Sequence, residues 1–277
     1  MRSRSKGFLS SVAYHLFSSF LAVAVMVPFF WMVITSLKDK GAMLTVPVQW
    51  IPTHPNLLSF DKVIHLFRFD TALLNSGIVS VLATAVTILS AAMAAYGFAK
   101  IEFRGREGLF RIYLATMMIP FQVVLIPLFL VMKELGLINS FVGLIIPSVF
   151  NAFAIFMLRQ QMMTIPNDFI DAAVLDGAGQ YRVFRLIILP LTAPTLITLG
   201  VITFMGTWND YLWPLVMLSD RKKMTLPLVL NVLNGQYTSD YNVLMAGALI
   251  SMAPILLLYL IAQKYFKAGL QVGGIKG

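Results

Sequence analysis

The sequence predicts an all-α protein that crosses a membrane several times. Of its 277 residues, 58% are hydrophobic and only 12% are charged, and the mean hydropathy is +0.82. A soluble domain of this size would carry about 25% charged residues, so this chain has too few charges to cover a soluble globule. Long uncharged segments also recur along the chain. These observations exclude a water-soluble enzyme and a disordered chain.

Six uncharged segments are each longer than the roughly 20 residues that a helix needs to cross a hydrocarbon core of about 30 Å. The first segment follows basic residues, as in a signal peptide, but it is far longer than the usual apolar run of about 7–15 residues. We therefore predict six transmembrane helices in one domain, residues 1–277, with an uncleaved first span. The expected spans are about 10–37, 71–99, 110–132, 138–158, 186–209 and 241–263.

The Lys and Arg residues predict the orientation, because cytoplasmic loops carry an excess of them. When the N-terminus is placed inside, the inner segments hold most of the basic residues and the outer segments most of the acidic ones. We therefore predict that both termini are cytoplasmic. The same bias explains the net charge of +9. No basic run is longer than Arg221–Lys223, so binding to nucleic acid is not expected.

Several kinds of active site are missing from the sequence. The chain has no cysteine and only three histidines, so no metal site is expected. No HExxH, GxSxG or P-loop pattern occurs, which disfavours a membrane enzyme. Apart from Arg111 at the edge of the span 110–132, the predicted spans hold no Asp, Glu, Lys or Arg, whereas ion-coupled carriers usually place ionisable groups there. Energy for uphill transport would have to come from another chain.

Polar side chains inside the predicted spans include Asn75, Gln122 and Asn151. They could line a pathway for a polar solute. Interhelical hydrogen bonds by such residues are common in membrane bundles, and we favour that explanation for any single one of them.

The inner loop at 159–185 has an unusual pattern. Pro166 suits the start of a helix, and acidic residues follow in the expected first turn, where the helix dipole favours them. Gly177 suits the end of this helix, because glycine adopts the left-handed conformation without strain. A second short helix, about 179–188, is expected to lead into the fifth span.

The face of this expected helix is bare at Ala172 and Ala173, so another surface can approach closely. We therefore predict a short docking helix on the cytoplasmic side. The alternative is an amphipathic linker that lies on the membrane. The acidic start at Asp168 and Asp171 disfavours that alternative, because anionic lipid attracts basic faces.

This loop resembles the EAA loop of ABC-importer permeases, in which E-A-A is followed by D-G-A and by a hydrophobic-x-L-P ending. Asp171 stands where the family has Glu, which keeps the charge but shortens the side chain. Similar agreement extends over the whole chain, for example at Met118–Pro120 and Trp208–Pro214, and is greatest with the maltose-type second permease of the carbohydrate-importer branch. The matching loop residues are Asp171, Ala172, Ala173, Asp176, Gly177, Ala178, Ile187, Ile188, Leu189 and Pro190.

The resemblance implies a type I ABC-importer permease fold and a subunit that is not itself an enzyme. It implies that the EAA loop contacts an ATPase, through Asp171, Ala172, Ala173, Asp176, Gly177, Leu189 and Pro190. This chain would bind no cofactor, since ATP and Mg²⁺ belong to the ATPase. The implied partners are a second permease, two ATPase subunits, an extracytoplasmic solute-binding protein and the lipid bilayer of a bacterial or archaeal cytoplasmic membrane. Arg182 and Arg185 either support the loop through ion pairs or face the membrane surface.

The resemblance also implies that the last outer loop, about 234–242, reaches toward the solute-binding protein. We expect a turn at Asn234-Gly235, and an ordinary hairpin loop is the alternative role. The implied activity is import of a sugar or oligosaccharide; glycerol phosphate, another polar solute and an autonomous channel are the alternatives. The candidate residues of the outer loop are Asn234, Gly235, Gln236, Tyr237, Asp240 and Tyr241.

Overall fold

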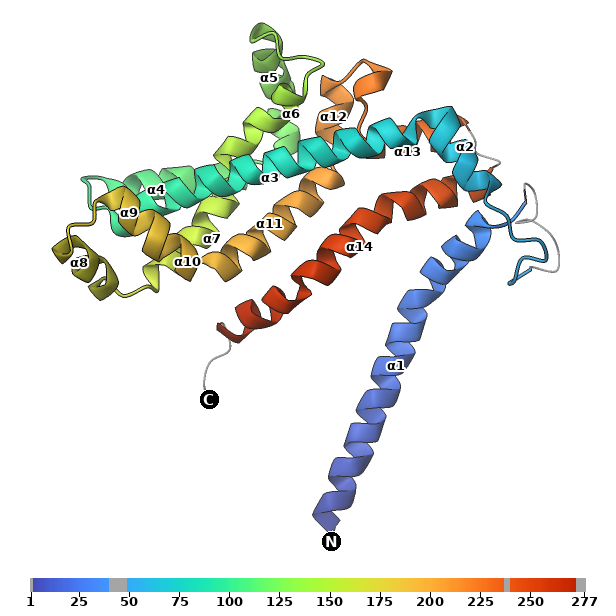
Figure 1. Cartoon of the computed structure of the whole chain (residues 1–277), viewed down its shortest axis with the longest axis horizontal. Helices are drawn as coiled ribbons and strands as arrows, with labels where there is room; N and C mark the ends of the chain where they lie inside the picture. Colours follow the sequence, from blue (N-terminus) through green and yellow to red (C-terminus); the bar gives the residue numbers. More distant parts are fainter. Residues whose placement is uncertain (1, 40–48, 237–239, 273–277) are drawn as a thin grey trace. The chain divides into compact units, whose positions relative to one another are not determined.

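The computed structural model describes residues 2–39, 49–236 and 240–272, with side chains described over 11–39, 49–65, 68–235 and 240–263. Every regular element in these ranges is helical (Figure 1), which confirms the predicted all-α class. The longer helices are α1 (Arg2–Ser36), α2 (Leu58–Phe67), α3 (Phe69–Lys100), α4 (Arg106–Ala115), α5 (Phe121–Glu134), α7 (Ala152–Met163), α8 (Asp168–Leu175), α11 (Ala193–Trp208), α13 (Leu226–Gln236) and α14 (Tyr241–Val272). The shorter elements are η2 (Thr116–Met118), α6 (Phe141–Ile145), η3 (Ile146–Phe150), α9 (Gln180–Val183), η4 (Phe184–Ile188), α10 (Leu189–Leu191), α12 (Leu212–Met217) and η5 (Arg221–Lys223).

The chain divides into two compact units. The first contains residues 1–69 and 230–252, and therefore α1, α2 and the start of α14. The second contains residues 70–229 and 253–277, and therefore nearly all of α3 and every element from α4 to α12. The predicted docking loop lies entirely in the second unit.

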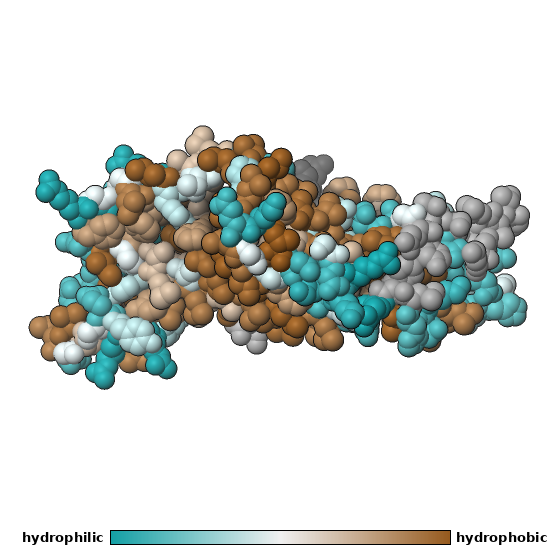
Figure 2. Space-filling view, turned by 90° about the horizontal axis from the view of Figure 1, so that it is seen from above, coloured by the Kyte–Doolittle hydropathy of each residue, from teal (hydrophilic) through white to brown (hydrophobic). Residues whose placement is uncertain are grey.

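Within the described residues, three helices are long and apolar enough to cross a membrane. Much of their apolar surface is uncovered: Tyr14, Phe17 and Phe20 of α1 are each more than 60% exposed. Figure 2 shows broad hydrophobic areas on the face that it draws. Exposed apolar surface of this extent is what a lipid-facing helix requires. The three helices cover Ser11–Ser36, Phe69–Lys100 and Tyr241–Gln263, in agreement with the predicted spans 10–37, 71–99 and 241–263.

The predicted span 110–132 is not one straight helix. It consists of two helical segments that meet at 101°. The bend falls at Pro120, which has no backbone N–H and disfavours helical geometry in the residue before it. Ile119 accordingly has extended backbone angles, with φ −86° and ψ 115°. The prediction of a span at 110–132 did not include this bend.

The predicted spans 138–158 and 186–209 are also bent, by 41° and 76°. The first bend lies at Asn151, which has an extended backbone and whose Oδ1 accepts a hydrogen bond from the Ala154 N–H at 2.9 Å. The second lies at Thr192, whose hydroxyl donates to the Ile188 carbonyl at 2.9 Å. Prolines flank this second break, and polar caps of this kind replace the backbone bonds that a break removes. If each bent pair is one span, the described part of the chain has up to six spans.

A hydrophobic core fills one end of the second unit. It joins α3, α7 and the segment from α9 to α11, with Ala95, Leu158, Val183 and Leu199 all fully buried. Alanines on α3, such as Ala91, let neighbouring helices approach closely. This core lies beneath the predicted docking loop, because half-buried residues of that loop pack against it.

The second unit brings the predicted inner segments together at one end of α3 and the predicted outer segments together at the other. At the inner end, the Lys100 ammonium donates to the Ile165 carbonyl at 2.6 Å. At the outer end, the Asn75 amide donates to the Met224 carbonyl at 3.0 Å. This separation is the one that an alternating membrane topology requires.

Candidate functional site

The predicted docking helix is α8, and both of its ends follow from the sequence. It begins at Asp168, just after Pro166, and its first turn contains Asp168 and Asp171. Asp176 follows the helix, and Gly177 has a φ of +78°. A residue with a Cβ is strained in that left-handed conformation, so glycine suits the turn that ends α8.

The two sides of α8 have different surroundings. Ile170 and Ala173 are half-buried against the core of the second unit. Ala173 therefore lies on the inward side of α8, and its predicted contact with a partner stays a prediction. The residues on the outward side are exposed and follow one another at helical spacing, so they form one strip along the helix. We call this strip the docking face: Asp168, Asp171, Ala172 and Leu175.

The docking face combines an apolar centre with acidic neighbours. Leu175 is 89% exposed, and the nearby Phe169 is 53% exposed. Ala172 adds no bulk between them. A single exposed leucine is ordinary on a protein surface. An exposed leucine and phenylalanine on one short helix with two carboxylates suit a partner groove with an apolar floor and a basic rim.

Two side chains in the last turns of α3 hold both ends of the segment that carries α8. The Lys100 ammonium donates to the Ile165 carbonyl at 2.6 Å and to Asn167 Oδ1 at 2.8 Å, just before α8. The Tyr96 hydroxyl donates to Gln180 Oε1 at 2.6 Å, at the start of α9. Tyr96 is buried. The whole docking segment is therefore anchored on α3.

A buried arginine ties together the helices beneath this segment. Arg159 on α7 is 5% exposed. Its Nε donates to the Phe98 carbonyl on α3 at 3.0 Å, and its guanidinium pairs with the Glu107 carboxylate on α4. The guanidinium carbon also lies 4.0 Å from the ring centroid of Phe110. A buried charge is stable only when its donors are satisfied in this way.

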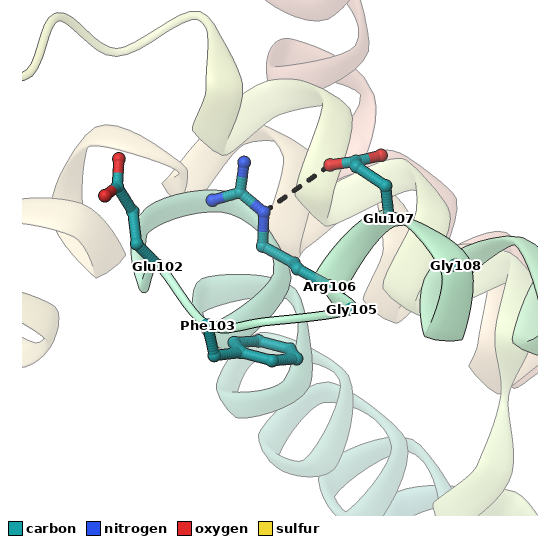
Figure 3. Close-up of a pocket in the computed structure, with 6 residues that line it drawn as sticks. All are labelled: Glu102, Phe103, Gly105, Arg106, Glu107 and Gly108. Atoms are coloured by element: carbon teal, nitrogen blue, oxygen red, sulfur yellow. Dashed lines mark ion pairs between the residues drawn. The ribbon is translucent and has the colours of Figure 1, made fainter.

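A pocket of about 380 Å³ lies at the turn between α3 and α4. Figure 3 shows the Arg106 side chain between the carboxylates of Glu102 and Glu107, with the Phe103 ring turned away from them. Arg106 Nε lies 3.5 Å from Glu107 Oε1. Both carboxylates are exposed, so this is a solvated turn. Within the described residues, no group of three His, Asp or Glu could hold a metal ion.

The other predicted residues of the loop lie away from the docking face. Leu189 is half-buried in the core and Pro190 is exposed, and both belong to α10. Arg182 and Arg185 are exposed, and neither forms an ion pair with any described residue. Their interpretation as ion-pair supports of the loop therefore gains no support.

The described start of the predicted outer loop is helical. Asn234 and Gly235 lie inside α13, so the predicted turn at these residues is wrong. Burial of the neighbouring Leu233 overrides the local turn preference. Asp240 is 2% exposed, whereas Tyr241 is 40% exposed at the start of α14. Contact of either residue with a solute-binding protein stays a prediction. Tyr237 and the side chain of Gln236 lie outside the described residues.

Two of the three predicted pathway residues have local hydrogen-bonding roles. The Asn75 amide is buried and donates to the carbonyls of Lys222 and Met224 at 2.9 and 3.0 Å. Asn151 caps α7. Gln122 is exposed at the start of α5. Contact of any of these residues with a solute stays a prediction.

Comparison with known proteins identifies the family. The profile of the family described as "binding-protein-dependent transport system inner membrane component" matches residues 87–272. The chain belongs to this family. It is 33% identical over 270 residues to the arabinooligosaccharides transport system permease protein AraQ of Bacillus subtilis, covering 96% of both chains. It is 32% identical over 252 residues to the lactose transport system permease protein LacG of Rhizobium radiobacter, covering 90% of both.

A solved structure supports the same fold for this permease. It belongs to a bacterial ABC transporter involved in the import of the acidic polysaccharide alginate, and it matches with a TM-score of 0.83 at 25% identity. The match covers 93% of this chain and 96% of that one. The predicted resemblance to ABC-importer permeases is confirmed.

The part of the permease matched by the family profile contains the docking face and its anchors. The profile begins at residue 87, within α3, so that Tyr96, Lys100 and Arg159 all lie inside it. Reasoning from the sequence missed these three as functional residues. Lys100 and Arg159 were visible only as charges at the inner ends of apolar runs, and nothing singled out Tyr96.

Proposed function

We propose that this permease is the membrane subunit of an ATP-driven importer for a sugar or oligosaccharide. It would work with a second permease, two ATPase subunits that bind ATP and Mg²⁺, and an extracytoplasmic solute-binding protein. The assembly would reside in the cytoplasmic membrane of a bacterium or archaeon. The sugars named for relatives, arabinooligosaccharides and lactose, support this class of substrate.

The observation that carries the proposal is the docking face. It presents Leu175 almost fully exposed on a helix whose two ends are anchored to α3. An autonomous channel has no evident use for such a segment. An ATPase subunit does, because its conformational change must reach the membrane through a defined contact.

We further infer that each bent pair of helices is one span, which makes six spans with both termini cytoplasmic. The clustering of the predicted inner segments around Lys100, and of the predicted outer segments around Asn75, supports this topology. The bends can be accommodated in a membrane protein where polar caps or neighbouring helices satisfy the freed backbone groups.

In the proposed mechanism the ATPase subunits close around ATP and carry α8 with them. Leu175 would fill an apolar pocket of the ATPase, and Ala172 would let the two backbones approach. Asp168 and Asp171 would face basic groups at the rim. The spans would then change from inward-open to outward-open as a two-state rigid-body movement.

Purification in mild detergent tests the assembly. A tagged permease is isolated from its native cells, and proteins present in stoichiometric amount are identified by mass spectrometry. Recovery of a second permease and a P-loop ATPase supports the proposal. A stable homo-oligomer without an ATPase contradicts it and favours the channel.

Uptake by cells with and without the gene tests the substrate. Labelled arabinotriose, lactose, diacetylchitobiose and glycerol 3-phosphate form the panel. Loss of uptake of one of the three sugars in the deletion strain, restored by the gene, supports sugar import. Loss of glycerol 3-phosphate uptake alone would leave the importer in place and replace the substrate.

A further inference from the structure

We propose that Tyr96 and Lys100 are positioning residues that make α8 and α3 move as one body. Movement at the docking face would then reach the membrane through α3. This inference rests on the proposed function, since it assigns the route by which an ATPase acts on the permease.

The first support is that both residues lie on the same side of α3. They are four positions apart, which places their side chains one above the other on the helix. Lys100 holds the chain before α8, at Ile165 and Asn167. Tyr96 holds the chain after it, at Gln180. One strip of α3 therefore holds both ends of the docking segment.

The second support is that the packing of α8 on the core is only partial. Its inward residues, Ile170 and Ala173, are only half-buried, and it has no fully buried residue. The basic residues of the same loop, Arg182 and Arg185, form no ion pair with described residues. The hydrogen bonds from α3 therefore add a polar restraint at both ends of the segment to the packing of Ile165, Ile170 and Ala173 on the core.

The third support is the continuity of α3. It runs unbroken from Phe69 to Lys100, whereas the three helix pairs around it are bent by 41° to 101°. Its outer end is tied as well, because Ser76 Oγ accepts a hydrogen bond from the Leu226 N–H at 2.7 Å. A straight helix held at both ends can transmit a displacement that a bent one would absorb.

The chemistry of the two residues allows clean substitutions. Tyr96→Phe removes the hydroxyl but keeps the ring, which lies 5.2 Å from the ring of Phe184. Lys100→Met keeps most of the length of the side chain and removes every donor. Lys100→Arg keeps the charge and the donors. Arg104→Met is the matched control, because Arg104 is an exposed cation in the turn just after Lys100.

The test measures the distance between α3 and α8 in the purified complex. The natural chain has no cysteine, so single cysteines at Leu74 on α3 and Val174 on α8 can carry spin labels. These side chains are 67% and 49% exposed. The distance distribution is recorded without nucleotide and after trapping with MgATP and vanadate, and the ATPase rate is measured on the same samples.

We expect one narrow distribution in both states of the labelled parent permease. With Tyr96→Phe and Lys100→Met together, the distribution should become about twofold broader and shift on trapping, because local restraints of this kind set how far a segment opens. Lys100→Arg and Arg104→Met should preserve the parent distribution. The ATPase rate of Lys100→Arg and of Arg104→Met should stay within about twofold of the parent rate, since neither substitution removes a contact of α8.

Three results would overturn the inference or its basis. If trapping shifts the distance in the parent permease, α8 moves independently of α3. If the double variant keeps the narrow distribution, the two residues do not position α8. If the double variant is not recovered folded, Tyr96→Phe alone decides, because it leaves the packing intact. Absence of an ATPase from the preparation would instead refute the proposed function. The composition of the preparation is determined before any distance is measured, so the two failures can be told apart.

Discussion

Replacement of Gly177 by Val should release the end of the docking helix. Gly177 has a φ of +78°, and a Cβ built on it meets no atom within 4 Å. The penalty is therefore conformational and not steric. A residue with a Cβ costs roughly 1–2 kcal/mol in the left-handed region, and a β-branched residue lies at the upper end. The frequency with which the end of α8 opens should rise about 5- to 30-fold.

Amide hydrogen exchange of the purified permease measures this effect directly. The amides of Gly177 and Ala178, which bond to the carbonyls of Val174 and Ala173 at 2.9 Å, are the reporters. Gly179→Val is the matched control. Gly179 also has no atom near a built Cβ, but its φ is −73°, which any residue adopts. Equal exchange in the two variants would refute the reasoning, because it would mean that the left-handed turn does not hold α8.

Three other predictions concern burial and charge. Arg159→Met should lower the Tm in detergent by roughly 5 °C, because a backbone carbonyl and a carboxylate lose their donor. The control Arg111→Met, at an exposed arginine, should leave the Tm unchanged. An equal fall of the Tm in both variants would contradict the role of the buried arginine. Leu175→Asp should reduce the amount of co-purified ATPase at least tenfold, since a leucine buried in the contact contributes about 1.5–3 kcal/mol to binding. The Tm of the permease should not change, because Leu175 is 89% exposed. Undiminished recovery of the ATPase would show that this residue is not at the contact. Burial raises the pKa of Asp210 above its ordinary value of 3.8, so the native state keeps its proton to higher pH and stability falls as the pH rises through this range. Asp210→Asn should therefore match or exceed the natural Tm at pH 7, with a difference that shrinks toward about pH 4; a lower Tm at pH 7 would show that the charge itself is needed.

The positions of the long helices could be predicted because the membrane imposes one simple demand on composition. A span must be apolar over about 20 residues, and the uncharged runs that became α1, α3 and α14 meet it. The bends could not be predicted from that demand, since a run of apolar residues fixes length and not straightness. Pro120 was a visible signal for one bend. The break at Thr192 depends on hydrogen bonds that only the folded helix reveals.

The docking helix was predictable at its ends and not at its faces. Acidic residues at the start and Gly177 at the end act locally, through the helix dipole and the left-handed turn. Which of Ala172 and Ala173 faces outward depends on the core beneath the helix, which is formed by residues far away in the sequence. The failure at Asn234-Gly235 has the same cause: a local turn preference of this size yields to the burial of a neighbouring leucine.

The basic residues show most clearly where reasoning from sequence alone ends. A lysine or arginine at the inner end of a span predicts orientation, because the translocation of its charge is unfavourable. The same charge must find acceptors once the chain folds. For Lys100 these are oxygens of Ile165 and Asn167, more than 60 positions away along the chain. Orientation and positioning are therefore separable: Lys100→Arg should preserve both, whereas Lys100→Met should leave the topology intact, because the other inner basic residues remain, and should still loosen α8.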